Sequence, residues 1–221
     1  MNSIEENLRH IYKTIPEDVT LVAVSKTKPV SDLLEAYKAG QRIFGENKIQ
    51  EMTQKWEELP KDISWHMIGH VQTNKVKYMA SYVDTIHAVD SLKLLKEINK
   101  QAIKNTRTIN CFLQIKIAEE ESKFGLNDAE AIDLLNSEEV KLLTNIKITG
   151  LMGMASFTNN TEQIKNEFKK IQSLFEKLKT DHPTLKTLST GMSGDYILAI
   201  ESGSTMVRIG SSIFGARNYS H

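Results

Sequence analysis

Short apolar runs alternate with longer amphipathic stretches along the 221 residues of the chain. Apolar, often β-branched residues fill the short runs, which is typical of buried strands, whereas the longer stretches repeat apolar residues at helical spacing. The predicted strands are 21–26, 42–45, 64–69, 83–89, 109–117, 146–153, 186–190 and 206–209. The predicted helices are 31–40, 47–59, 73–81, 91–104, 127–143, 160–180 and 194–202, and an extra helix at about 3–14 precedes the first strand.

Strands that alternate with helices predict a parallel sheet built from right-handed βαβ units. About eight such units favour a closed sheet over an open one. We therefore expect an α/β protein with one domain over residues 1–221, a (β/α)8 barrel of the TIM type with an extra N-terminal helix. The alternative is a doubly wound open sheet, which is weakened because no G-x-G-x-x-G follows the first predicted strand.

The composition limits the kinds of partner and the cellular compartment that we expect for the protein. Lys plus Arg and Asp plus Glu both number 28, so the chain lacks the net basic charge of a general nucleic-acid binder. Cys111 is the only cysteine, so no intramolecular disulfide can form, which fits a reducing compartment. The N-terminus is polar and acidic, unlike a signal peptide, and no apolar run approaches a membrane span. We expect a cytoplasmic protein without nucleic-acid or membrane partners.

The first predicted strand ends in a lysine. Side chains alternate along a strand, so Val22, Val24 and Lys26 share one face. If that face is a protein interior, burial would disfavour the charged form of the amine and lower its pKa, which prepares it to attack a carbonyl. The position therefore suggests Schiff-base chemistry. The alternative is a lysine at a strand end that extends its charge to solvent.

Two loops rich in small residues follow the last two predicted strands. They are Ser189-Thr190-Gly191-Met192-Ser193 and Arg208-Ile209-Gly210-Ser211-Ser212. In barrels of this type the loops after strands seven and eight often bind phosphate, because glycine permits close approach and serine adds hydrogen bonds. The alternative is that Ser193 is a helix N-cap and Gly191 a turn residue. A reactive lysine beside a phosphate site suggests a phosphorylated carbonyl compound, either pyridoxal phosphate or a sugar phosphate.

Seven short segments extend the pattern over nearly the whole chain. They are Ala23-Val24-Ser25-Lys26-Thr27-Lys28-Pro29, Phe44-Gly45-Glu46-Asn47, Trp65-His66-Met67-Ile68-Gly69-His70-Val71-Gln72-Thr73-Asn74-Lys75, Ser122-Lys123-Phe124-Gly125, Gly150-Leu151-Met152, Ser189-Thr190-Gly191-Met192-Ser193 and Gly203-Ser204-Thr205-Met206-Val207-Arg208-Ile209-Gly210, the last continuing to Ile213-Phe214-Gly215. With these segments the chain resembles, from about residue 5 to Tyr219, the pyridoxal 5'-phosphate homeostasis proteins. That family shares the barrel of the alanine racemase N-terminal domain.

We expect no metal, because His66 and His70 have no convincing partner at metal-ligand spacing. The resemblance implies a set of cofactor-binding residues. Lys26 would carry pyridoxal 5'-phosphate as an internal aldimine. The remaining implied residues are Ser193, Gly210 and Ser211 near the phosphate, Arg208 near the pyridine nitrogen, Asn47 and Met67 along the pocket, and Lys123 as a second lysine close to the cofactor. Read from the residues alone, Met67 is a packing residue and Arg208 could instead pair with a carboxylate.

The expected function is cofactor carriage without catalysis. An arginine cannot accept a proton from the ring nitrogen, so it leaves the ring a poorer electron sink. Racemase-like enzymes carry a second domain with an opposing tyrosine base, and only six residues follow Gly215 here. We expect a monomer or weak dimer that exchanges pyridoxal phosphate with transient apo-enzyme recipients. The alternatives are a pyridoxal-phosphate-dependent amino-acid racemase or lyase and a cofactor-free Schiff-base aldolase.

Overall fold

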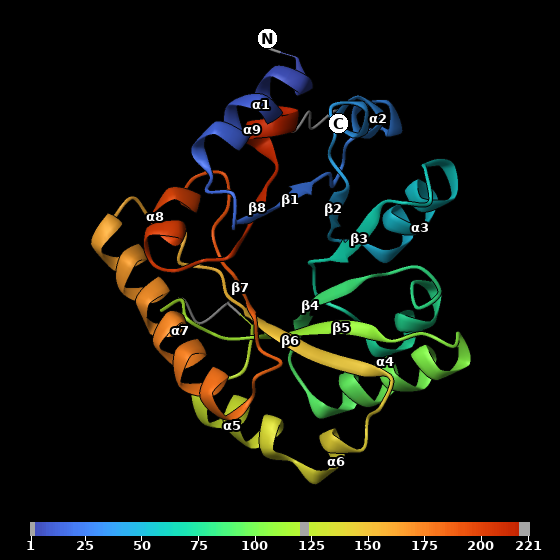
Figure 1. The fold of residues 1–221 in the computed structure, drawn as a ribbon, viewed down its shortest axis with the longest axis vertical. Helices are drawn as coiled ribbons and strands as arrows, with labels where there is room; N and C mark the ends of the chain where they lie inside the picture. The colour runs from blue at the N-terminus through green and yellow to red at the C-terminus, as the bar shows by residue number, and fades with distance from the viewer. Residues whose placement is uncertain (1–2, 120–123, 217–221) are drawn as a thin grey trace.

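The computed structural model describes residues 3–119 and 124–216, and within them parallel strands form a closed barrel in chain order, β1 to β8 (Figure 1). The strands are β1 (Thr20–Val24), β2 (Ile43–Glu46), β3 (Ser64–Met67), β4 (Thr85–Val89), β5 (Ile109–Gln114), β6 (Ile146–Met152), β7 (Thr187–Ser189) and β8 (Met206–Ile209). β8 closes the barrel against β1, with Val22 opposite Arg208. The predicted (β/α)8 barrel is confirmed.

Helices surround the barrel and connect its strands (Figure 1). They are α1 (Ile4–Thr14), α2 (Val30–Lys38), α3 (Ile49–Glu58), the 3-10 helix η1 (Thr73–Tyr78), α4 (Leu92–Lys104), α5 (Asp128–Asn136), α6 (Glu138–Lys141), α7 (Thr161–Asp181), α8 (Tyr196–Glu201) and α9 (Ser211–Phe214). No helix in the described part of the chain is long and apolar enough to cross a membrane.

The extra N-terminal helix is confirmed as α1. It begins with a capping box, in which the Ser3 hydroxyl accepts from the Glu6 backbone N–H and the Glu6 carboxylate accepts from the Ser3 N–H. The Asn7 side chain donates to the Ile213 carbonyl at 2.9 Å, so α1 is tied to α9, beside which it lies in Figure 1. α1 thus packs against the end of the barrel where the chain finishes its last strand.

Several predicted boundaries differ from the structure. The helix expected over 127–143 is two helices, because Ser137 adopts an extended conformation between α5 and α6. The stretch expected as a helix over 73–81 is the shorter η1. The first strand ends at Val24, two residues before its predicted end. α9 was not predicted, since four residues are too few to show a helical period.

Two apolar clusters divide the core. The larger lies between the barrel wall and the helices and includes Phe44 and Trp65, whose rings are 6.0 Å apart. The smaller consists of Val22, Ala88, Phe112, Met152 and Met206, one from each of five strands. Because strand side chains alternate between two faces, this second set fills the barrel interior. The predicted inward direction of Val22, on the face assigned to Lys26, agrees with this placement.

Candidate functional site

Lys26 lies in a tight turn directly after β1. The Ser25 N–H still donates to the Gly45 carbonyl of β2 at 3.1 Å, and the Lys28 N–H donates back to the Ser25 carbonyl at 3.1 Å. Lys26 and Thr27 are therefore the two central residues of the turn, and Thr27 has a φ of 64°. The half-buried Lys26 is thus carried by a turn at the carboxyl end of the barrel, called the mouth below, rather than by the last position of a strand.

A buried group of charges holds this turn. The Lys55 ammonium of α3 donates to the Ser25 carbonyl, to Glu46 Oε1 and to Glu51 Oε1, each at 2.7 Å. The Ser25 hydroxyl donates to Glu46 Oε1 and the Thr27 N–H donates to Glu51 Oε1, both at 2.6 Å. This group was not predicted from the sequence. The i,i+4 spacing of Glu51 and Lys55 on one helix could have indicated their pair, but no local pattern joins them to Glu46 or to the turn.

Glu46 is the most buried member of the group, with an exposed fraction of 0%, and Lys55 follows at 4%. Burial raises the pKa of the Glu46 carboxyl, and the charge of Lys55 and the hydrogen bonds from Lys55 and Ser25 oppose that shift. Glu46 Oε2 is buried and has no hydrogen-bond partner within the described residues. Beneath the Lys26 turn there is therefore an ion cluster in which one carboxylate oxygen of Glu46 is hydrogen-bonded and the other is not.

The two late loops meet at the hydroxyl of Ser193. Ser193 Oγ accepts from the Gly210 N–H at 3.2 Å and from the Ser212 N–H at 3.4 Å. The N-cap alternative for Ser193 is wrong, since Asp195 occupies the N-cap of α8 and accepts from the Met192 N–H at 2.6 Å. Two backbone donors from the start of α9 thus converge on one oxygen.

Two glycines of these loops allow close approach of the chain. Gly191 has a φ of +91°, as the turn alternative predicted, and a Cβ there would lie 2.6 Å from the Ala199 side chain. A Cβ on Gly210 would lie 3.0 Å from the Val24 carbonyl and 3.3 Å from the Val24 side chain. Gly210 therefore brings the late loops into contact with the last residue of β1, two residues before Lys26.

Arg208 is buried in β8, with an exposed fraction of 4%. One guanidinium nitrogen donates to the carbonyl and the hydroxyl of Ser189, at 2.8 and 2.7 Å, and another donates to the Gly153 carbonyl at 3.0 Å. Burial lowers the pKa of Arg208 to about 10, so the group stays charged at neutral pH. The ion pair with a neighbouring carboxylate does not form among the described residues.

A hydrogen-bonded chain continues from Arg208 into the barrel. Ser189 Oγ lies 3.2 Å from His87 Nδ1, and His87 Nε2 lies 2.9 Å from His66 Nδ1. Because Arg208 donates to Ser189, the hydroxyl proton is available to His87 Nδ1, which leaves a proton on His87 Nε2 for His66. Burial lowers the pKa of His66 to about 4 and that of His87 well below its usual value, so both rings are neutral.

Sequence reasoning treated His66 as a residue without a convincing metal partner and did not single out His87. Within the described ranges no cluster of three or more His, Cys, Asp or Glu side chains could hold a metal ion. The signal that could have joined the two histidines is strand parity, because His66 pairs with Thr85 and His87 lies two positions further along β4, on the same face. Cys111 is buried in β5, and burial raises the pKa of its thiol, as expected of an inert cysteine.

The other predicted site residues differ in their burial and in whether they lie at the mouth. Asn47 follows β2 at the mouth and is half-buried, and its backbone carbonyl lies 2.4 Å from the position that a Cβ on Gly69 would occupy. Met67 is fully buried in the larger cluster together with Trp65, as a packing residue would be. Ser211 is exposed at the start of α9. Lys123 lies outside the described residues.

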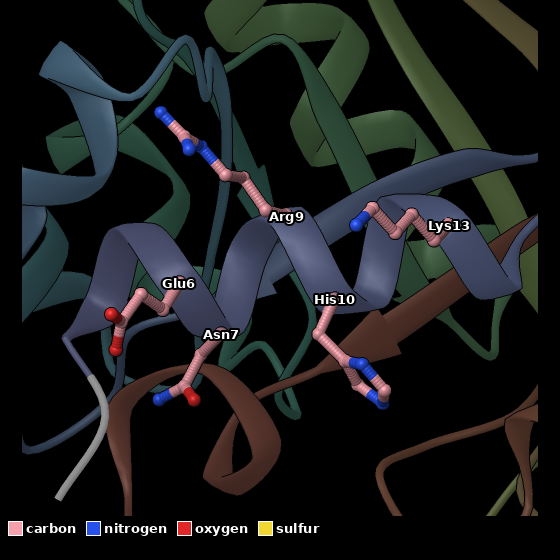
Figure 2. A pocket seen from close by; sticks show the side chains of 5 residues that line it. All are labelled: Glu6, Asn7, Arg9, His10 and Lys13. Atoms are coloured by element: carbon pink, nitrogen blue, oxygen red, sulfur yellow. The ribbon is translucent and has the colours of Figure 1, made fainter.

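A hollow on the surface lies along α1, and none of the predicted cofactor-site residues lines it. Glu6, Asn7, Arg9, His10 and Lys13 line it. Figure 2 shows that Arg9 extends from one side of α1 whereas Asn7 and His10 extend from the other, so these side chains do not converge on a common point. We therefore place the candidate site at the mouth.

The family comparison agrees with this architecture. The model of the alanine racemase N-terminal domain family matches residues 1–218. A pyridoxal phosphate homeostasis protein of Vibrio alginolyticus is 40% identical over 235 aligned residues, with 100% of both chains covered. One from Haemophilus influenzae is 42% identical and covers 91% of this chain and 86% of its own. The chain belongs to the family of the pyridoxal phosphate homeostasis proteins.

Solved structures show the same barrel. PipY of Synechococcus elongatus PCC7942 without PLP superposes with a TM-score of 0.90 at 34% identity, covering 96% of this chain and 100% of PipY. The structure of PipY with PLP bound superposes with a TM-score of 0.87 at 33% identity and the same coverage. A relative of this chain with the same fold therefore binds pyridoxal phosphate.

Proposed function

We propose that this protein binds pyridoxal 5'-phosphate at the mouth of the barrel, with Lys26 as the attachment residue, and takes part in intracellular homeostasis of that cofactor. Family membership supports the proposal, as does PipY with its bound PLP. The observation that carries it is the contact between the two halves of the site. Gly210, which brings an N–H to Ser193, lies against the residue two positions before Lys26.

The residues at the mouth fit the chemistry of this cofactor. A phosphate needs several donors in a small space, and the N–H groups of Gly210 and Ser212 with the Ser193 hydroxyl supply them. A Cβ at Gly210 would fill space between the loops and β1. In the proposal Ser211 extends this cradle, Asn47 lines the pocket and Lys123 provides a second amine. Met67, which the resemblance also implied, packs in the larger apolar cluster outside the barrel wall, so it supports the wall and does not line the pocket.

Arg208 would face the pyridine nitrogen. Its buried guanidinium already donates to Ser189 and Gly153, which fixes its orientation before any ligand binds. When bound, the cofactor supplies an aldehyde for condensation with an amine and a ring that withdraws electrons. A permanently charged donor opposite the ring nitrogen does not accept a proton, so the site favours holding the cofactor over carbanion chemistry.

Carriage without efficient turnover is the finer part of the proposal, together with a cytoplasmic location and apo-enzymes as recipients. The names of the curated relatives support it. The test mixes the loaded protein with an apo-enzyme that needs pyridoxal phosphate and follows the recovery of that enzyme's activity. Lys123→Ala is expected to slow the transfer more than it weakens binding, because a second amine can take over the cofactor from Lys26.

The same loaded protein is then incubated with a panel of amino acids. We expect no racemase or decarboxylase turnover in the range typical of enzymes, about 1–10³ per second. Robust turnover of any amino acid would overturn carriage and favour a racemase-like enzyme. Direct transfer requires that the apo-enzyme recover its activity faster than the cofactor dissociates from the loaded protein into buffer. Recovery at or below that dissociation rate would contradict it.

A further inference from the structure

The side chains that hydrogen-bond to the backbone of the Lys26 turn belong to α3, outside the turn itself. Lys55 of α3 binds the Ser25 carbonyl and Glu51 of α3 binds the Thr27 N–H, so α3 holds the backbone on both sides of Lys26. We propose that Glu51 and Lys55, backed by Glu46, are positioning residues that set the direction in which the Lys26 amine meets an aldehyde. This inference rests on the proposed function, because it takes Lys26 as the attachment residue.

The turn needs such a grip because its backbone is strained. Thr27 has a φ of 64°, and the left-handed region is unfavourable for a β-branched residue. Its N–H is bound by Glu51 Oε1 at 2.6 Å, a short hydrogen bond to a charged acceptor. If that bond were absent, Thr27 would be expected to relax toward a negative φ, which would turn the neighbouring Lys26 away from its present direction.

The grip is also rigid. A lysine ammonium has three protons, and Lys55 places them on three acceptors at 2.7 Å: Ser25, Glu46 and Glu51. Glu46 Oε1 in turn binds both Lys55 and the Ser25 hydroxyl. Each displacement of the turn would therefore break contacts on the Ser25 side and on the Thr27 side together.

Stability alone does not account for this arrangement. A buried ion pair is seldom more stable than apolar residues of the same volume, because both charges lose their hydration. Here the cost is raised further, since Glu46 Oε2 is buried without a hydrogen bond within the described residues. The hydrogen bonds that offset this cost are made to the turn that carries Lys26. A fixed backbone at that turn would orient the amine for reaction.

Two substitutions at Glu51 distinguish the effect of its side-chain length from the effect of its negative charge. Glu51→Asp keeps the charge but is one methylene shorter, so it should lose the Thr27 N–H. Glu51→Gln loses the charge but keeps an oxygen that can accept from Thr27. The measurement is the rate at which a borohydride-stable pyridoxyl adduct forms on Lys26, followed by quenching and peptide mapping, with pyridoxal phosphate and with pyridoxal as separate probes.

We expect Glu51→Asp to slow adduct formation about tenfold with both aldehydes, because a misdirected amine is affected whether or not the probe has a phosphate. Glu51→Gln should stay within about threefold of the natural chain. Glu58→Ala, an exposed position at the end of the same helix, is the control and should change nothing. Circular dichroism confirms that each variant is folded.

A second comparison tests the strain directly. In a Thr27→Gly background the turn tolerates its φ without help, so Glu51→Asp should then slow the reaction less than threefold. Equal rates for Glu51→Asp and the natural chain would overturn the inference, as would a Glu51→Asp deficit unchanged by Thr27→Gly. If the natural chain itself forms no adduct on Lys26, the proposed function fails, and that outcome is distinct from the other two.

Discussion

The two sides of the barrel mouth are held in different ways. On the β1 and β2 side, the Lys26 turn is fixed by charged side chains of α3 that reach it from outside the barrel wall. On the β7 and β8 side, the loops are fixed by serine hydroxyls and backbone amides around Ser193 and by the buried Arg208. One side therefore carries Lys26 on a strained turn, and the other presents several donors on small residues.

This difference matches two kinds of binding. A covalent bond needs one atom in one direction, so rigidity at Lys26 matters more than the number of contacts. In the proposed function a phosphate would be held by several backbone and hydroxyl donors, and the glycines would let the chain come close to it. Gly210 joins the two sides through its contact with Val24, and changes there should affect both.

The largest effect is expected at Lys55. Lys55→Met leaves Glu46 and the Ser25 carbonyl buried without their shared donor, which should lower the free energy of unfolding by about 3–5 kcal/mol. Chemical denaturation measures it, with Lys48→Met at the exposed start of α3 as the control. Converting Glu46 to Met as well should recover part of the loss. A Lys55→Met protein as stable as its control would mean that the cluster does not hold the turn.

The stability of the barrel depends on pH through two buried histidines of β3 and β4, which a chain of hydrogen bonds joins to Ser189 and Arg208. Burial lowers the pKa of both rings, that of His66 to about 4, so their contribution to stability is complete above pH 6.5 and is lost as the pH falls below that value. While the rings stay neutral in the folded chain, each should lower the free energy of unfolding by roughly 1 kcal/mol for every unit by which the pH falls below 6.5.

Unfolding curves measured between pH 7 and pH 5 test this dependence. His66→Gln should flatten it by about half, whereas His10→Gln on exposed α1 should leave the slope unchanged. A natural chain whose stability does not change over this range would contradict the assignment of both rings as neutral.

A smaller effect is expected at the junction of the two sides. Gly210→Val places carbon atoms against the Val24 carbonyl, so the late loops must move away from β1. Overpacking of this kind costs about 1–3 kcal/mol, and we expect the affinity for pyridoxal phosphate to fall about tenfold or more. Gly194→Val in the same loop region meets nothing within 4 Å and serves as the control. Equal affinities in a titration of the two variants would show that this contact is dispensable.

The smallest effect is expected at Ser193. Ser193→Ala removes one hydroxyl but leaves the Gly210 and Ser212 N–H groups available to a phosphate. The affinity for pyridoxal phosphate should fall by a factor of about 5–10, while that for pyridoxal, which has no phosphate, should stay the same. A parallel loss for both compounds would place Ser193 elsewhere than at the phosphate.

The sequence showed one side of the site better than the other. The barrel and the small-residue loops follow from periodicity and from glycines and serines close together in the chain. Lys26 was found because it shares a strand face with Val22 and Val24, where burial would lower the pKa of its amine. The turn that carries it was not, because a positive φ at Thr27 has no signature in a β-branched residue.

The cluster beneath the turn and the histidine pair escaped for a common reason. Lys55 and Ser25 are 30 positions apart, and His66 and His87 are 21 apart, so only the closed barrel brings them together. The ion-pair alternative for Arg208 failed because its partners are neutral oxygens of Ser189 and Gly153. Contacts between distant segments depend on strand register, which the sequence pattern leaves undetermined to within a few residues.

The central claim is that the amine of Lys26 is where the protein holds pyridoxal phosphate. The most direct measurement is peptide mapping of the natural chain after it has been loaded and reduced with borohydride. The account predicts one pyridoxyl adduct in the natural chain, on the peptide that contains Lys26. In Lys26→Ala no other lysine should carry the adduct at full occupancy. An adduct on Lys28 or Lys123 in the natural chain, or undiminished occupancy in Lys26→Ala, would contradict it.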